Sequence, residues 1–258
     1  MIRIFITFFY TIFFSCSFSL VVYGQEIDFI EVIEVTAQKR MQSVQDVPIS
    51  IAAISSQTLS SAKINQAIEV TTLIPNVNAT RSISGLSNFY IRGVGMDGFN
   101  LSSIPAVGLY VDDVAIHSPV LANFALFDIN RIEVLKGPQN TLFGKNTTGG
   151  ALNFFTNEAN SQDEINGYGE LSLGSNSLII TEGAISFPLT PKANIRLSGF
   201  SQQRDGLVTS NIAGNNTEFN DINRYGVRIK LQYSFDEETQ LSVSLYGGQQ
   251  AQIAEVKT

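Results

Sequence analysis

The sequence predicts a small α+β domain followed by a series of antiparallel strands, with an apolar segment in front of both. Residues 47–156 mix short apolar runs of strand length with two helix-like segments and glycine-rich turns. From residue 164 onward, polar and apolar residues alternate with a period of two, which is typical of β-strands. Residues 1–24 begin with Arg3 and continue as a largely apolar run.

Composition excludes several classes of function. The net charge of −7 argues against a nucleic-acid partner. Cys16 is the one cysteine and His117 the one histidine, so a disulfide, a cysteine or histidine metal centre and a serine–histidine triad are all disfavoured. We therefore expect no enzyme activity, no resident metal and no cofactor.

Residues 1–24 are predicted to be a secretory signal peptide that is cleaved after Gly24. The alternative is an uncleaved membrane anchor, because Ile4–Val22 is about long enough to span a bilayer. Serine and threonine residues dilute this run, and Glu26 and Asp28 follow it in place of a basic cluster. Cleavage is therefore the favoured interpretation.

Residues 25–43 form a linker that contains EIDFIEVIEVTAQKR at 26–40. Its β-branched residues predict a short extended segment that can pair with the edge of another sheet. The pattern by itself favours a frayed N-terminal strand.

The α+β domain is predicted to span residues 44–158. Ser55 or Ser56 is expected to cap a helix at Gln57–Ala62, and Asn65 a second helix at Gln66–Leu73. Strands are predicted at Val47–Ile54, Val77–Thr80, Phe89–Arg92, Val107–Val111, Ile132–Leu135 and Ala151–Phe155.

Three local motifs resemble nucleotide-binding or paired-carboxylate sites, but each lacks a feature that such a site requires. Gly93, Gly95 and Gly98 form GxGxxG, but no helix pattern follows to receive a pyrophosphate. Gly144-Lys145 lacks the other P-loop residues. Asp112-Asp113 are adjacent after a strand, so their side chains point to opposite faces, and a solvated turn is expected.

Residues 131–156 read RIEVLKGPQNTLFGKNTTGGALNFFT. This string resembles the signature of the plug domain of TonB-dependent outer-membrane receptors. Asn140 departs from the signature, which has a glycine at that position. The resemblance implies an α+β plug domain that fills the lumen of a transmembrane β-barrel, with energy supplied through TonB and not by chemistry on the ligand.

The resemblance also implies site residues. Arg92 and Lys136 match basic positions that contact the barrel in such receptors. The predicted TonB box comprises Glu31, Val32, Ile33, Glu34, Val35, Thr36 and Ala37. Outward loops of the plug are expected to contact the ligand, through Arg81, Ser82, Met96, Asp97, Phe99 and Asn100.

Residues 159–258 are predicted to be about five strands of roughly ten residues each. Every odd residue in Tyr225–Phe235 is apolar, and every even residue is polar or glycine. A soluble sandwich would turn the apolar face inward, whereas a membrane barrel turns it outward, and the alternation does not distinguish them. The signal segment and the plug-like domain favour the barrel. Since about five strands cannot close a barrel, we expect the N-terminal part of a receptor, either a fragment or a truncated product.

The predicted function is therefore an outer-membrane, TonB-dependent receptor for energy-coupled uptake of a nutrient such as an iron–siderophore complex. Its expected partners are TonB in the periplasm, the lipid of the outer membrane and a small ligand that is an iron chelate, cobalamin or saccharide. The alternatives are a secreted or periplasmic ligand-binding β-module of the adhesion type and a non-functional truncated receptor.

Overall fold

A computed structural model describes residues 34–36, 42–81, 87–96, 105–117, 122, 124–159, 164–212, 215–236 and 239–251. The predicted signal segment lies outside the described residues, as do Glu31–Ile33 and Ala37 of the predicted TonB box. The described chain contains an N-terminal domain, residues 42–159, and a C-terminal sheet, which begins at Asn166.

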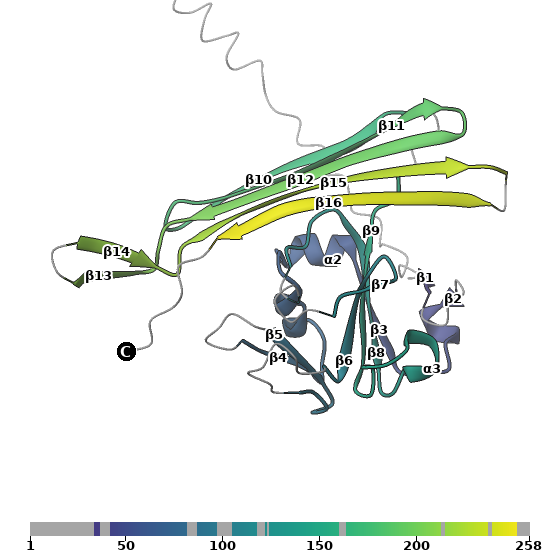
Figure 1. Ribbon diagram of the computed structural model, residues 1–258, viewed down its shortest axis with the longest axis horizontal. Helices are drawn as coiled ribbons and strands as arrows, with labels where there is room; N and C mark the ends of the chain where they lie inside the picture. Colours follow the sequence, from purple (N-terminus) through teal and green to yellow (C-terminus); the bar gives the residue numbers. More distant parts are fainter. Residues whose placement is uncertain are drawn as a thin grey trace, which may run out of the picture. The chain divides into compact units, whose positions relative to one another are not determined.

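The N-terminal domain is built on a five-stranded sheet with the strand order β3-β8-β9-β6-β7 (Figure 1). Neighbouring strands are antiparallel except for β6 and β9, which are parallel. The strands are β3 (Ile51–Ser55), β6 (Val107–Val111), β7 (Val114–Ala115), β8 (Ile129–Lys136) and β9 (Gly150–Thr156). The predicted strands at 107–111, 132–135 and 151–155 are thereby confirmed.

Both faces of this sheet are covered. The larger core lies under α2 (Ser56–Ser61), the 3₁₀ helix η2 (Ala67–Thr72) and the hairpin of β4 (Val77–Arg81) and β5 (Ser87–Ile91). The smaller core on the opposite face lies near β1 (Glu34–Val35), β2 (Gln42–Ser43), the 3₁₀ helix η1 (Val44–Asp46) and α3 (Asn140–Phe143). Buried side chains on both faces of the sheet explain why β6 reads VGLYV, without a charged residue.

The helix predicted at 57–62 is confirmed, because the Ser55 side chain accepts a hydrogen bond from the Thr58 amide and caps α2. The second helix was predicted incorrectly. It is a 3₁₀ helix, and Asn65 does not cap it. The Glu69 carboxylate accepts from the amides of Asn65 and Gln66 at 2.8 and 3.0 Å, so a glutamate inside the helix satisfies the donors before it.

The strand predicted at Val47–Ile54 begins later than expected, at Ile51, and continues to Ser55. The glycine-rich stretch between β8 and β9 contains the one-turn helix α3. Asn140 is its first residue, and the Oδ1 atom of Asn140 accepts a hydrogen bond from the buried Thr147 hydroxyl at 2.9 Å. Asparagine therefore replaces the signature glycine without strain, since its φ is not positive.

Asp112 and Asp113 form the two-residue turn between β6 and β7, with φ of 46° and 65°. Positive φ at both central positions is the geometry that hairpin turns of this length require. The expectation of a solvated turn holds for Asp113, which is exposed, but is wrong for Asp112. The Asp112 carboxylate accepts hydrogen bonds from the Thr156 amide and hydroxyl at 2.8 and 2.6 Å.

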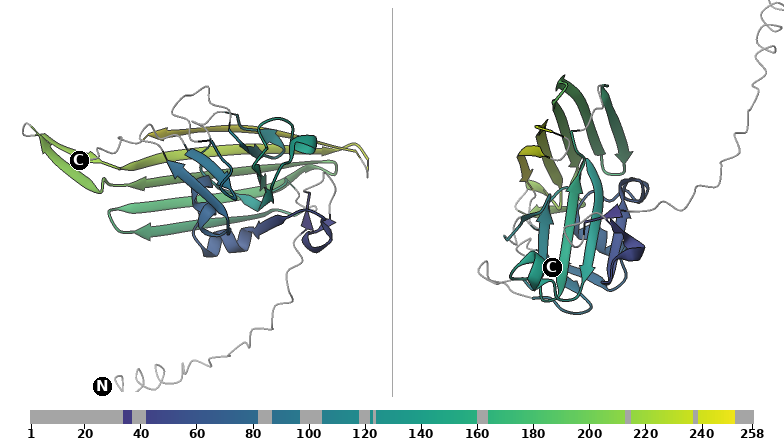
Figure 2. Two further views of the ribbon diagram at one scale, coloured as in Figure 1. Left: turned by 90° about the horizontal axis from the view of Figure 1, so that it is seen from below. Right: turned by 90° about the vertical axis from the view of Figure 1, so that its right-hand side faces the viewer.

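The C-terminal sheet is an antiparallel meander with the order β10-β11-β12-β15-β16 (Figure 2). Its strands are β10 (Asn166–Gly174), β11 (Leu178–Thr190), β12 (Ala193–Arg204), β15 (Ile222–Ser234) and β16 (Gln240–Ala251). The hairpin of β13 (Val208–Ile212) and β14 (Asn215–Phe219) lies between β12 and β15 in the chain. The five strands of this sheet match the prediction of about five, and β13 and β14 are two further strands that were not predicted. The sheet does not close in the described part of the chain.

The structure shows which face of this sheet is covered. In β15 the even residues are buried: Arg224, Arg228 and Lys230 are 3%, 7% and 2% exposed. The odd residues are exposed, including Val227 at 56% and Ile229 at 42%. Polar-in and apolar-out is the arrangement of a membrane barrel and the reverse of a soluble sandwich.

Candidate functional site

The polar inner face of the C-terminal sheet contacts the N-terminal domain through a buried ion pair. Asp128 precedes β8 and Arg196 lies in β12. The Asp128 carboxylate accepts from Nε and a terminal nitrogen of Arg196 at 2.8 and 2.5 Å, while the other terminal nitrogen donates to the Ser186 hydroxyl at 2.8 Å. The side chains of Arg196 and Asp128 are 9% and 1% exposed. Two parallel charge-assisted hydrogen bonds of this kind are stronger and more specific in geometry than neutral hydrogen bonds.

The rest of Asp128 is also fully engaged. Its amide donates to Glu182 at 2.8 Å, its carbonyl accepts from the Asn157 amide at 3.0 Å, and its carboxylate accepts from the Asn157 side chain at 2.8 Å. Its φ is 52°, a conformation that aspartate and asparagine adopt more readily than most residues. Because every polar group of Asp128 has a partner, this buried carboxylate is stabilised in place.

Phe127 forms the apolar half of the same contact. Its ring, 1% exposed, stacks on Phe200 with centroids 4.8 Å apart and lies 6.0 Å from the ring of Tyr246. The Arg228 guanidinium lies over the Phe127 ring at 4.4 Å and donates to the Phe127 carbonyl at 3.2 Å. A side chain at Gly226 would meet both phenylalanine rings, so the glycine there permits the close approach.

A second ionic contact lies around Lys230 of β15. Its ammonium group is 3.3 Å from Asp112 and 3.3 Å from Glu158, both of which belong to the N-terminal domain. A third contact, between Lys63 and Glu170, is exposed by comparison, with side chains 60% and 38% accessible. The inner face of the sheet is thus complementary in charge to the domain that covers it.

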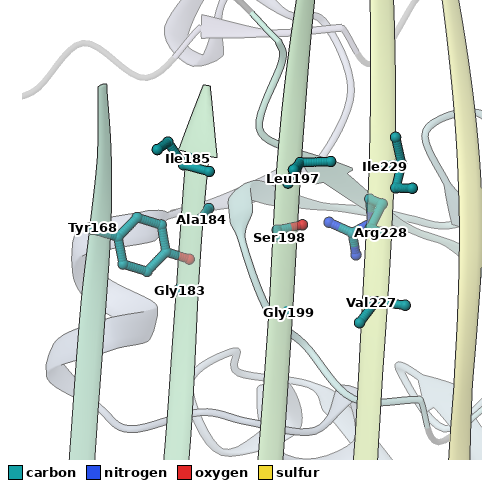
Figure 3. Close-up of a pocket in the computed structure, with 10 residues that line it drawn as sticks. All are labelled: Tyr168, Gly183, Ala184, Ile185, Leu197, Ser198, Gly199, Val227, Arg228 and Ile229. Carbon is teal, nitrogen blue, oxygen red and sulfur yellow. The ribbon is translucent and has the colours of Figure 1, made fainter. Parts of the chain in front are cut away.

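The outer face of the sheet is apolar. Figure 3 shows a shallow depression in it, where Gly183 and Gly199 leave bare backbone between the side chains of Ile185, Leu197 and Val227. An extended apolar face of this kind on a polar-lined sheet is suited to lipid.

The N-terminal segment is bound to the N-terminal domain. Val35 is fully buried in the smaller core, with Tyr110, whose pKa is raised by burial. The Thr36 amide and hydroxyl both donate to Glu133 of β8, at 2.9 and 3.3 Å. Arg131 donates to the same Glu133 oxygen at 2.8 Å and to the Thr36 hydroxyl at 2.9 Å.

The residues predicted from the resemblance occupy three places. Glu34–Thr36 of the predicted TonB box form the docked segment. The side chain of Arg92 donates to Ser50, and that of Lys136 to the Pro75 carbonyl, so these hydrogen bonds stay within the N-terminal domain.

Contact of these two cations with barrel strands remains a prediction. Of the predicted ligand loops, Arg81 and Met96 are exposed. Ser82, Asp97, Phe99 and Asn100 lie outside the described residues.

The sequence analysis did not identify Phe127, Asp128 or Arg196 as site residues. One signal was available, because all the basic residues of β12 and β15 occupy even positions, opposite to the apolar odd ones. That signal marks a polar face but does not reveal its partners.

In the described ranges, no helix is long and apolar enough to cross a membrane. No group of three or more His, Cys, Asp or Glu side chains is arranged to hold a metal among those same residues.

Comparison with known proteins agrees with this geometry, in which a small α+β domain rests on the polar face of a sheet with an apolar outer face. Residues 43–151 match the TonB-dependent Receptor Plug Domain family. The chain is similar to the pesticin receptor of Yersinia enterocolitica, with 32% identity over 184 residues, which are 70% of this chain and 24% of that protein. It is 27% identical over 161 residues to the ferripyoverdine receptor of Pseudomonas aeruginosa, covering 62% of this chain and 19% of the relative.

Among solved structures, the ferric yersiniabactin uptake receptor FyuA from Yersinia pestis aligns with a TM-score of 0.70 and 25% identity. The alignment covers 78% of this chain and 31% of FyuA. The chain therefore carries the plug domain and the first barrel strands of a TonB-dependent receptor. It spans about a quarter of the length of the curated relatives that it matches.

Proposed function

We propose that this chain is the N-terminal portion of an outer-membrane receptor that takes up a ferric siderophore with energy transmitted by TonB. The observation that carries the proposal is the orientation of the C-terminal sheet. Its apolar residues face outward and its polar residues face the plug, which is the arrangement of a barrel wall around an occupied lumen.

The buried contacts between plug and wall support a transport role over a catalytic one. The residues at the contact are paired with one another, as in Asp128–Arg196 and Lys230–Asp112. Paired charges of this kind hold two structural parts together, and separating them requires work. A receptor driven by an external energy source can supply that work.

The docked segment Glu34–Thr36 supports the TonB-box assignment. It pairs with β2 in a two-stranded sheet and is attached to β8 through Thr36 and Glu133. An extended segment held by one short pairing and a few hydrogen bonds can be released and paired with a partner strand in the periplasm. Cleavage of residues 1–24 as a signal peptide and export to the outer membrane belong to the same proposal.

The ligand class is inferred from relatives whose names refer to ferripyoverdine and ferric yersiniabactin. Vitamin B12 is the alternative, since a cobalamin transporter from Vibrio vulnificus is 26% identical over 157 residues. The outward plug loops with Arg81 and Met96 remain the proposed ligand contacts.

The test is uptake of ⁵⁵Fe by a bacterium that lacks its other iron receptors and expresses the receptor that carries this chain. Ferric yersiniabactin, ferripyoverdine and radiolabelled cobalamin are supplied in parallel. Replacing Val35 and Thr36 with proline is expected to abolish uptake while binding to cells persists. The matched control replaces Gln57 and Ser61, which are exposed residues of α2 outside the predicted site, with alanine.

Uptake that is unchanged by the two prolines contradicts the TonB-box assignment. Separately, the chain is expected to require detergent for extraction from outer-membrane fractions. Release as a soluble protein by salt and carbonate would favour the secreted β-module and contradict the receptor proposal.

A further inference from the structure

The charges of the C-terminal sheet are divided sharply between its strands. β12, β15 and β16 contain no aspartate or glutamate. Their basic residues all occupy even positions, on the inner face, and we call them the cationic strip. The strip comprises Arg196, Arg204, Arg224, Arg228 and Lys230. β10 and β11 carry the opposite charge, with Glu170 and Glu182 and no basic residue.

The register of the strands groups the strip into two clusters. Arg204 pairs with Ile222 and Gln202 with Arg224, so Arg204 and Arg224 are diagonal neighbours on one face. Arg196 is directly opposite Lys230 across the same pair of strands. Arg228 lies two positions from Lys230 on the same face, whereas the Gly226–Phe200 pair separates it from Arg224. Neighbours of this kind lie about 7–8 Å apart or less, so Arg196, Arg228 and Lys230 are close enough to act together on one ligand.

The carboxylates that balance the central part of the strip come from the plug and not from the wall. Asp128 pairs with Arg196, and Asp112 and Glu158 pair with Lys230. At the end of the strip formed by Arg204 and Arg224, the side chain of Arg224 donates to the neutral Gln202. Displacing the plug would therefore remove the carboxylates and leave the cations on the wall.

We propose that the inner face of β12 and β15 is an anion-binding wall, which the plug carboxylates cover in this conformation and which guides an anionic ligand when the plug moves. This inference rests on the proposed receptor function, and it specifies the ligand as one that presents carboxylate or similar anionic groups. Guanidinium groups suit such ligands because they bind carboxylates with two parallel hydrogen bonds. A lumen that is lined by charges of one sign and has low-dielectric walls also raises the local concentration of ions of the opposite sign.

The experiment measures the sign of the potential at the wall with a single thiol. Ser244 of β16 is exposed, lies on the inner face and is directly opposite Lys230. Ser244→Cys is introduced into the full chain with Cys16→Ser, so that one thiol is present. Its reaction rate is measured with two methanethiosulfonate reagents, one carrying a sulfonate and the other a trimethylammonium group.

Asp112→Asn with Glu158→Gln removes the plug carboxylates while leaving the strip. The ratio of anionic to cationic reaction rates is expected to rise about four-fold, which is about two-fold for each unit charge in water at about 8 Å with physiological screening. Adding Lys230→Gln to these two substitutions is expected to lower the ratio again by about two-fold. The matched control is Lys192→Gln, which removes the same charge from the exposed turn before β12 and leaves the ratio unchanged.

A ratio that does not rise on loss of the two carboxylates, or that responds equally to Lys192 and Lys230, overturns the proposal. Lys230→Gln by itself provides a second measurement in a chain with an unaltered plug, where the ratio is expected to fall about two-fold. The thiol reaction requires neither TonB nor a siderophore. The uptake test can therefore fail while the thiol reaction gives the expected ratios, so failure of the receptor proposal is distinguishable from failure of the anion-binding proposal.

Discussion

The buried pair Asp128–Arg196 gives the sharpest prediction about how the plug is held. Asp128→Asn preserves the size of the side chain and tolerates the positive φ at this position, so the change isolates the loss of charge. It leaves the Arg196 guanidinium, 9% exposed, without its carboxylate. Removing one partner of a buried pair typically costs about 3–5 kcal/mol. Since 1.4 kcal/mol is about a factor of ten, the detached population should grow more than a hundred-fold.

The assay is amide hydrogen exchange of the chain in detergent, followed in the peptide that contains Phe127 and Asp128. The Asp128 amide donates to Glu182 of the wall, so it exchanges when the plug leaves the wall. The Asn157 amide donates to the Asp128 carbonyl within the plug and serves as an internal reference. Faster exchange in the Asp128→Asn variant is the expected result.

Two variants calibrate the measurement. Glu170→Gln breaks the exposed pair with Lys63 and should cost less than about 1 kcal/mol, because solvent screens such pairs. Asp128→Asn with Arg196→Met removes both charges and should recover part of the loss, since no unpaired buried charge remains. If Asp128→Asn matches Glu170→Gln within about 0.5 kcal/mol, the buried pair does not anchor the plug and the reasoning is refuted.

Two further predictions concern the plug itself. The Tyr110 hydroxyl donates to the Phe143 carbonyl at 2.5 Å, and burial raises the pKa of Tyr110. The stability that it contributes is therefore complete below the unfolded pKa of about 10 and is lost as the pH rises above it. Urea midpoints at pH 9 and 11 should fall more in the wild type than in Tyr110→Phe, and equal falls would contradict this assignment. Asp113→Gly should stabilise the plug by about 0.5–1 kcal/mol, since the φ of 65° favours glycine and the side chain is exposed. Thermal unfolding checks it against Asp113→Val, which should be destabilising, and a lower midpoint for the glycine variant would contradict it.

The elements that the sequence predicted well are those determined by local pattern. Strand β6 lies where its apolar run predicts, and β15 follows the alternation of Tyr225–Phe235. The cap of α2 was visible because Ser55 precedes a helix-like segment and acts on an amide three residues away. The second helix was assigned to the wrong class because the sequence pattern does not separate a 3₁₀ helix from an α-helix. Its cap was missed although the signal was local, since Glu69 accepts from amides three and four residues before it.

The binding of the plug to the wall was beyond prediction because its partners are far apart in the chain. Asp128 and Arg196 are separated by 68 residues, and Phe127 and Arg228 by 101. Nothing in the short motif Phe127-Asp128 distinguishes it from an ordinary turn before a strand. Only the folded chain brings the aromatic ring against Phe200 and the carboxylate against Arg196.

The orientation of the C-terminal sheet shows what kind of information was missing. Alternation specifies two faces but assigns neither to the interior, because a sandwich and a barrel share the same period. The assignment follows once the even-numbered Arg196 and Lys230 find their counter-charges on a separate domain. Burying a cation is costly unless it has partners, and the plug supplies partners for Arg196, Arg228 and Lys230. The plug therefore occupies the lumen side and also makes a polar inner wall compatible with burial. For the same reason, moving the plug must expose charge on the wall.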